Sequence, residues 1–254
     1  MGYPPELIDK FHLLWGDGFM SPGGPEEVRR IVGRLDLRKR EVLDIGCGTC
    51  GPAIVLARDF GARFTGADVE DLVLERAAAQ IAAAGLSDRI RCVRIEPGPF
   101  PFADNAFDAV FSKDALIHVA DKSALYREIM RVLKPGGVSV ASDWLAGENA
   151  AADPEFQAFA GREDMSFSMA TARETAAAMQ QSGFADVETE DRNAWYAENS
   201  AQELERLLGD LRERAIALLG RQSYDSWMVM RTRIARAVAS GSLRPTDLRG
   251  IKPA

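Results

Sequence analysis

The sequence has few cysteines and histidines and fewer positive than negative charges, and each feature excludes some classes of protein. Its 254 residues include three cysteines, an odd number that argues against a disulfide framework and for a reducing compartment. Its two histidines, His12 and His118, are the only imidazole candidates for acid–base chemistry. The formal net charge of -7 argues against a nucleic-acid partner, because nucleic-acid binders usually present basic surfaces.

Long hydrophobic runs are also absent. The apolar stretches are far too short to cross a bilayer, and residues 1–10 have neither the basic nor the apolar region of a signal peptide. We therefore expect a cytoplasmic protein without a membrane partner. With 46% hydrophobic residues and no internal repeat or low-complexity linker, the chain is expected to form a single domain over residues 1–254.

Strand and helix patterns alternate through the first two thirds of the chain. This alternation predicts an α/β fold with a mostly parallel sheet and helices on both faces. Beyond residue 144 the pattern loosens. The expected strands are 41–45, 63–69, 90–95, 107–112, 138–143, 185–190 and 248–253, and the expected helices are 5–14, 25–35, 53–59, 72–84, 122–133, 171–182, 198–220 and 224–240.

The stretch VLDIGCGTCG, residues 42–51, is the clearest motif. Gly46, Gly48 and Gly51 follow a short strand and open a helix, so the backbone can approach a ligand closely and the helix N-terminus favours a negative group. With Asp68 at the distance expected for a ribose-binding acid, the spacing alone fits NAD and an oxidoreductase.

Cys47 and Cys50 within this motif spell C-x-x-C, which is typical elsewhere of redox or metal chemistry. The chain has no second pair to complete a zinc site, and both cysteines fall inside the glycine loop. We therefore expect no metal.

Four features around the glycine loop resemble the class I S-adenosylmethionine-dependent methyltransferases. They are Asp44 at the strand end, a glycine- and proline-rich lid ahead of the first strand, Glu96 after the third strand, and LKPGG before the fifth. The resemblance implies a Rossmann-like fold with a seven-stranded sheet and a helical cap. It also implies S-adenosylmethionine as cofactor and S-adenosylhomocysteine as product.

The same resemblance implies roles for particular residues. Asp68 would hold the ribose hydroxyls, Glu96 the adenine amine, and Val69 would form an apolar wall. Residues 1–24 would form an N-terminal helix and lid, 25–144 the cofactor-binding core, and 145–254 the substrate cap and last strands. The implied cofactor-binding residues are Ser21, Asp44, Gly46, Gly48, Gly51, Asp68, Val69, Glu96, Pro97, Lys113 and Asp114.

Residues 16–24 (GDGFMSPGG) and 112–122 (SKDALIHVADK) resemble segments of the phosphoethanolamine N-methyltransferases. In that family a tyrosine and a histidine form a catalytic couple, and Tyr3 and His118 match them. An imidazole suits this role, because an amine must lose its proton before its nitrogen can attack a methyl group. The resemblance implies methylation of a small-molecule amine, once or in successive steps, with His118 as general base. We assign His12 to the surface or to packing.

The chain departs from that family where the substrate phosphate is held. The family uses two tyrosines, an arginine and a lysine there, and the matching positions are Trp144, Ser166, Ser168 and Met230. Losing these donors argues against a phosphobase substrate, although Arg162, Arg231 or Arg233 could restore an anion site. We expect Trp144, Trp195 and Trp227 to bind the acceptor, because tryptophan faces suit methylated ammonium groups. Packing in the core of a helical cap is an equal alternative for Trp195 and Trp227.

Other functions stay open at this stage. The protein could methylate sulfur or oxygen of a small metabolite, act as an NAD-dependent oxidoreductase, or bind the cofactor as a sensor without turnover. The sequence does not determine the oligomeric state.

Overall fold

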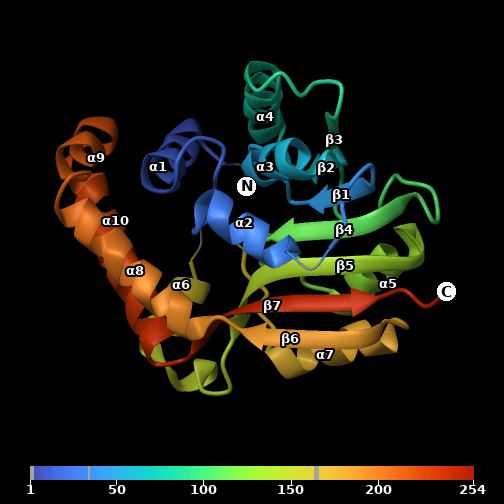
Figure 1. The fold of residues 1–254 in the computed structure, drawn as a ribbon. Coiled ribbons are helices and arrows are strands. Elements are labelled where there is room, and N and C mark those ends of the chain that lie inside the picture. Colours follow the sequence, from blue (N-terminus) through green and yellow to red (C-terminus); the bar gives the residue numbers. More distant parts are fainter. Residues whose placement is uncertain (1–2, 34, 163–165) are drawn as a thin grey trace.

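The computed structural model describes residues 3–33, 35–162 and 166–254, and its centre is a twisted sheet (Figure 1). The strand order is β3-β2-β1-β4-β5-β7-β6, and β7 alone runs in the direction opposite to the other six strands. This confirms the predicted α/β fold with a mostly parallel seven-stranded sheet. The strands are β1 (Glu41–Ile45), β2 (Arg63–Asp68), β3 (Ile90–Arg94), β4 (Phe107–Lys113), β5 (Leu133–Ala146), β6 (Ala185–Asp191) and β7 (Leu243–Ile251).

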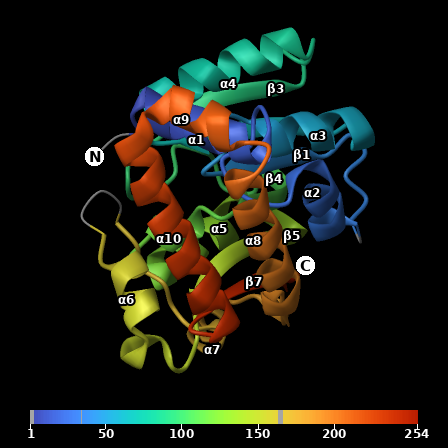
Figure 2. The same cartoon turned by 90° about the vertical axis from the view of Figure 1, so that its left-hand side faces the viewer.

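Helices cover both faces of the sheet (Figures 1 and 2). On β1, Val42 packs into the apolar core formed with α2, α3 and α4, whereas Leu43 faces the core formed with α5 and α7. Successive strand residues are thus buried on opposite sides, which explains the unbroken apolar run. These helices are α2 (Gly24–Val32), α3 (Gly51–Phe60), α4 (Asp71–Ala83), α5 (Lys122–Val132) and α7 (Ala172–Gln181).

The remaining helices form a cap beside the carboxyl ends of the parallel strands (Figures 1 and 2). None of the helices in the described part of the chain is long and apolar enough to cross a membrane. The cap consists of α1 (Pro5–Trp15), α6 (Pro154–Ala160), α8 (Asn193–Leu208), α9 (Arg212–Leu219) and α10 (Arg221–Ala239), and two 3-10 turns, η1 (Leu116–His118) and η2 (Ala150–Ala152), complete the fold.

The structure corrects several predicted boundaries. The two long C-terminal helices are three, because Gly209 ends α8 and Gly220, with a φ of 76°, separates α9 from α10. Strand β5 begins at Leu133 rather than at residue 138, since the LKPGG segment pairs with its neighbours. Gly136 donates to the Lys252 carbonyl, and the Lys252 N–H donates to the Gly137 carbonyl.

A buried ion pair holds the cap together. Glu203 on α8 accepts hydrogen bonds from the guanidinium of Arg231 on α10 and, at 2.7 Å, from the indole N–H of Trp15 on α1. Asn199 donates to the same carboxylate at 2.7 Å. Glu203 and Arg231 are each at most 5% exposed, so one carboxylate links three helices away from water.

We expect Glu203→Gln to destabilise the protein by about 3–5 kcal/mol, because it leaves the Arg231 charge buried without a counter-charge. Thermal and urea unfolding would measure the change. Glu205→Gln, on the exposed side of the same helix, is the matched control and should stay close to the parent. Equal stabilities for the two variants would contradict this account of the cap.

Candidate active site

The glycine loop after β1 is closely packed by its neighbours. A side chain at Gly46 would overlap Ala115 in the segment after β4, and one at Gly51 would overlap the Gly18 carbonyl. Gly46 and Gly48 also have φ values of 68° and 53°, which favour glycine. The Gly51 N–H donates to the Gly18 carbonyl at 2.9 Å, so residues 16–24 lie directly against the start of α3.

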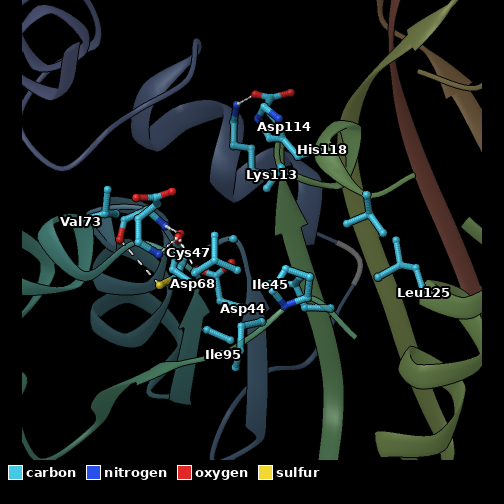
Figure 3. A pocket seen from close by; sticks show the side chains of 18 of the residues that line it. Asp44, Ile45, Cys47, Asp68, Val73, Ile95, Lys113, Asp114, His118 and Leu125 are labelled. Atoms are coloured by element: carbon cyan, nitrogen blue, oxygen red, sulfur yellow. Dashed lines mark hydrogen bonds and ion pairs between the residues drawn. The ribbon is translucent and has the colours of Figure 1, made fainter. Parts of the chain in front are cut away.

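A cavity of about 850 Å³ opens beside this loop, at the carboxyl ends of the parallel strands (Figure 3). Open α/β sheets bind their ligands at this edge. Gly51 does not line the cavity, because it is covered by the lid. All the other residues expected to bind the cofactor line it: Ser21, Asp44, Gly46, Gly48, Asp68, Val69, Glu96, Pro97, Lys113 and Asp114.

Asp68, at the end of β2, is fixed by the backbone around it. Its carboxylate accepts hydrogen bonds from the N–H groups of Gly48 at 3.0 Å, Val69 at 2.8 Å and Glu70 at 3.2 Å. Desolvation nevertheless raises the pKa of this carboxyl. The carboxylate keeps lone pairs for further donors, as the hydroxyls of a ribose would provide.

Asp44 is buried and one of its oxygens, Oδ2, has no hydrogen-bond partner among the described residues. Burial, and then the charge of Asp68, raises its pKa to about 8. Because Asp44 lines the cavity, a bound cation would compensate this carboxylate. The ammonium of S-adenosylmethionine is such a cation, so this residue fits the expected cofactor.

The far end of the cavity combines an apolar wall with an acid. Val69 is 41% exposed, unusual for a large apolar side chain, and forms a surface on which a flat base could lie. Glu96 is exposed and forms an ion pair with Arg94 at the end of β3, and Arg94 also contacts Asp71 at 2.9 Å. Arg94 therefore fixes the position of Glu96, the residue that is expected to bind the adenine amine.

Lys113 and Asp114 link β4 to the lid (Figure 3). The Lys113 ammonium lies 2.5 Å from the Asp114 carboxylate and donates to the Ser21 hydroxyl at 3.0 Å. Asp114 adopts a φ of 56°, which turns the chain after β4. Lys113 is buried, and its hydrogen bond to Ser21 ties the lid to the end of β4.

His118 and Tyr3 meet at the edge of this cavity. The Tyr3 hydroxyl lies 3.4 Å from His118 Nε2, and His118 Nδ1 lies 2.7 Å from the Ser166 carbonyl oxygen. The imidazole stacks on Phe167 with ring centroids 5.3 Å apart.

The surroundings shift the pKa values of both residues. Desolvation, helped by the charge of Lys122, lowers the pKa of His118. Burial, with Asp68 and Glu70, raises the pKa of Tyr3, so its phenol stays protonated.

A second cavity of about 110 Å³ adjoins the first, and Tyr3, Ser21, Asp114 and His118 line both. Its other walls combine aromatic and aliphatic side chains with the cations Lys10, Arg162 and Arg231. Trp195, expected to bind the acceptor, lines neither cavity: it faces Gly23 in the lid and the Arg192 guanidinium, 5.4 Å from its ring centroid. The walls specific to the small cavity include Phe11, Trp15, Trp144, Phe159, Phe167, Trp227 and Met230.

Of the four positions that hold phosphate in the resembling family, two line the small cavity in this chain and two form backbone hydrogen bonds. Trp144 and Met230 line the small cavity, Ser166 offers its carbonyl to His118, and the Ser168 N–H donates to the Ile117 carbonyl at 2.7 Å. Arg162 and Arg231 also line the small cavity, whereas Arg233 pairs with Glu155.

Lys10 on α1, which no motif in the sequence singled out, also lines the small cavity. The helical spacing of Trp227, Met230, Arg231 and Ile234 would have indicated one cavity-facing stripe on α10, and all four line the small cavity. Nothing in the sequence indicated that Cys92 would meet Cys47 and Cys50.

Comparison with known proteins supports the same cofactor site. Residues 43–141 match the methyltransferase domain family. Phosphoethanolamine N-methyltransferase 1 of Arabidopsis thaliana is 28% identical over 228 residues, which cover 88% of this chain and 44% of the relative. The chain thus spans less than half the length of this curated relative.

Two solved structures share the fold. Phosphoethanolamine N-methyltransferase 2 of Haemonchus contortus, in complex with phosphomonomethylethanolamine and S-adenosylhomocysteine, superposes with a TM-score of 0.90 at 24% identity, over 97% of this chain and 57% of that one. A putative sarcosine dimethylglycine methyltransferase from Galdieria sulphuraria gives 0.84 at 19% identity, over 98% and 99% of the two chains. The domain match and the relatives support a class I S-adenosylmethionine-dependent methyltransferase that is similar to the phosphoethanolamine N-methyltransferases, and the solved structures share its fold.

Proposed function

We propose that this chain methylates the nitrogen of a small-molecule amine and that His118 is the general base. The observation that carries the proposal is the position of the His118–Tyr3 couple, where the large and small cavities meet. S-adenosylmethionine bound in the large cavity supplies an electrophilic methyl group. The acceptor lies in the small cavity, with its nitrogen toward His118.

The contacts of His118 support its role as a base. The Ser166 carbonyl can only accept a hydrogen bond, so His118 Nδ1 carries the proton. Nε2 then holds the free lone pair, and the lowered pKa keeps the ring neutral near pH 7. An acceptor that enters as an ammonium ion can give its proton to Nε2. Once Nε2 carries this proton, it donates a hydrogen bond to the Tyr3 hydroxyl, 3.4 Å away, which orients the ring.

The small cavity suits an amine. Trp144 lies at the carboxyl end of β5 with its ring centroid 5.6 Å from that of Phe159, and both rings line the cavity. Aromatic faces attract ammonium groups, particularly away from water. The volume of about 110 Å³ is well below the roughly 300 Å³ at which typical ligand pockets begin, so the acceptor is small.

The same cavity argues against a phosphate on the acceptor. The places that hold phosphate in the resembling family are occupied by apolar Trp144 and Met230. Three cations, Lys10, Arg162 and Arg231, line the cavity, and the charge of Arg231 is already paired with Glu203. A phosphate dianion needs several charge-assisted donors. An amine without phosphate, as the name of the Galdieria protein implies for that protein, fits this cavity better.

We expect His118→Ala to lower kcat by roughly 10²- to 10⁴-fold, because the variant lacks the base. It keeps every residue to which we assign cofactor binding. Steady-state kinetics over a panel of small amines and amino acids would measure kcat. Calorimetric titration with S-adenosylhomocysteine is the control, and its Kd should be unchanged. Full turnover in the variant would refute the base assignment and favour an acceptor that needs no deprotonation, such as a thioether.

The pH profile gives a separate test. His118 acts as a base when it is neutral, and its pKa lies below the ordinary 6.5. We therefore expect kcat/KM to rise as the pH increases through this lowered pKa. Above it His118 is fully neutral, and its titration no longer changes kcat/KM. The acceptor amine titrates in both the parent and the His118→Ala variant. The ratio of their pH–rate profiles therefore isolates the histidine. A ratio that stays independent of pH from about 8 down to the lowest pH at which the protein remains folded would show that His118 carries no catalytic proton.

A further inference from the structure

The structure brings together three thiols that are separated in the sequence. Cys47 and Cys50 lie in the glycine loop, and Cys92 lies on β3, at the edge of the sheet. Their sulfur atoms are all within 4.8 Å of one another, and those of Cys50 and Cys92 are 3.6 Å apart. In the described part of the chain, this is the one group of three or more histidine, cysteine or acidic side chains close enough to share a metal ion.

Gly66 on β2 makes this arrangement possible. It pairs with Cys92 in the sheet, and the glycine loop lies above it. A β-carbon at Gly66 would lie 2.9 Å from the Cys47 sulfur and 3.2 Å from the Cys50 sulfur. Any side chain at this position would therefore push the thiols apart, and the missing side chain leaves the space that the sulfur atoms fill.

We propose that Cys47, Cys50 and Cys92 bind one thiophilic metal ion behind the cofactor loop. A metal–sulfur distance of about 2.3 Å places sulfur ligands about 3.8–4.0 Å apart, so the thiols need to move little. On binding, each thiol loses its proton to solvent and forms one bond to the metal, with no transfer of electrons. The site is independent of the methyl acceptor.

The donor atoms determine the class of ion. Three sulfur ligands select Cu(I), Zn(II) or Cd(II), whereas Mg²⁺ and Ca²⁺ require oxygen. Cys47 and Cys50 are buried but Cys92 is only half-buried, which gives the ion a path from the sheet edge. A disulfide uses only two of the three thiols, and its sulfur atoms must approach to about 2.05 Å.

Metal binding would tie the cofactor loop to the sheet. Cys50 is the residue before α3, and Cys47 lines the cofactor cavity, whereas Cys92 does not. The bound ion therefore links the loop and the helix N-terminus to β3. We expect the loaded protein to unfold at a higher temperature than the metal-free one.

Titration of the reduced, metal-free protein with Cd²⁺ tests the site. We expect one ion per chain, a thiolate-to-cadmium charge-transfer absorption, and slower reaction of the half-buried Cys92 thiol with a thiol reagent. Cys92→Ser should weaken the affinity for Cd²⁺ by roughly 100-fold or more. Mutating a residue that only hydrogen-bonds a metal ligand already lowers metal affinity by about 10- to 100-fold, and this variant loses a ligand itself. This variant should still bind S-adenosylhomocysteine, which shows that its cofactor loop is folded.

Three results would overturn the proposal. One is no saturable binding of Cd²⁺, and another is equal affinity in the parent and Cys92→Ser. The third is the loss of only two reactive thiols that a reductant restores, which would assign a disulfide in place of the metal site.

Discussion

The close packing around the loop after β1 is the constraint on which the rest of the structure depends. Gly46 leaves no room for a side chain beside Ala115, and Gly51 none beside Gly18 of the lid. These two approaches bring the lid and the segment after β4 to the same short stretch of backbone. The cofactor cavity, the lid contact through Ser21 and the position of His118 after β4 all follow from this convergence.

Much of this core could be predicted, because its determinants are local. An apolar run, a glycine loop and a helix start specify β1 and α3, and strand alternation places Asp68 and Glu96 at the carboxyl edge of the sheet. The resemblance to a known family supplied the chemistry. The comparisons then confirmed the fold and the class of cofactor, whereas the role of each residue, His118 above all, stays a prediction.

The cap could be predicted less well, since its contacts join residues far apart in the chain. The sequence does not indicate that Glu203 would pair with Arg231 and with Trp15, and this pairing balances the charge of Arg231 in the wall of the small cavity. Trp195 failed as a candidate because helix α8 turns it toward the lid. The meeting of Cys92 with the glycine loop depends on strand register, which composition does not reveal.

The central claim, methylation of a small amine, depends on which atom receives the methyl group. The most direct measurement is incubation of the protein with methyl-labelled S-adenosylmethionine and a cell metabolite extract, followed by mass spectrometry of the labelled product. We expect the label on the nitrogen of a small amine without a phosphate group. Label on sulfur, oxygen or carbon, or on a phosphorylated amine, or no labelled product at all, would contradict the account.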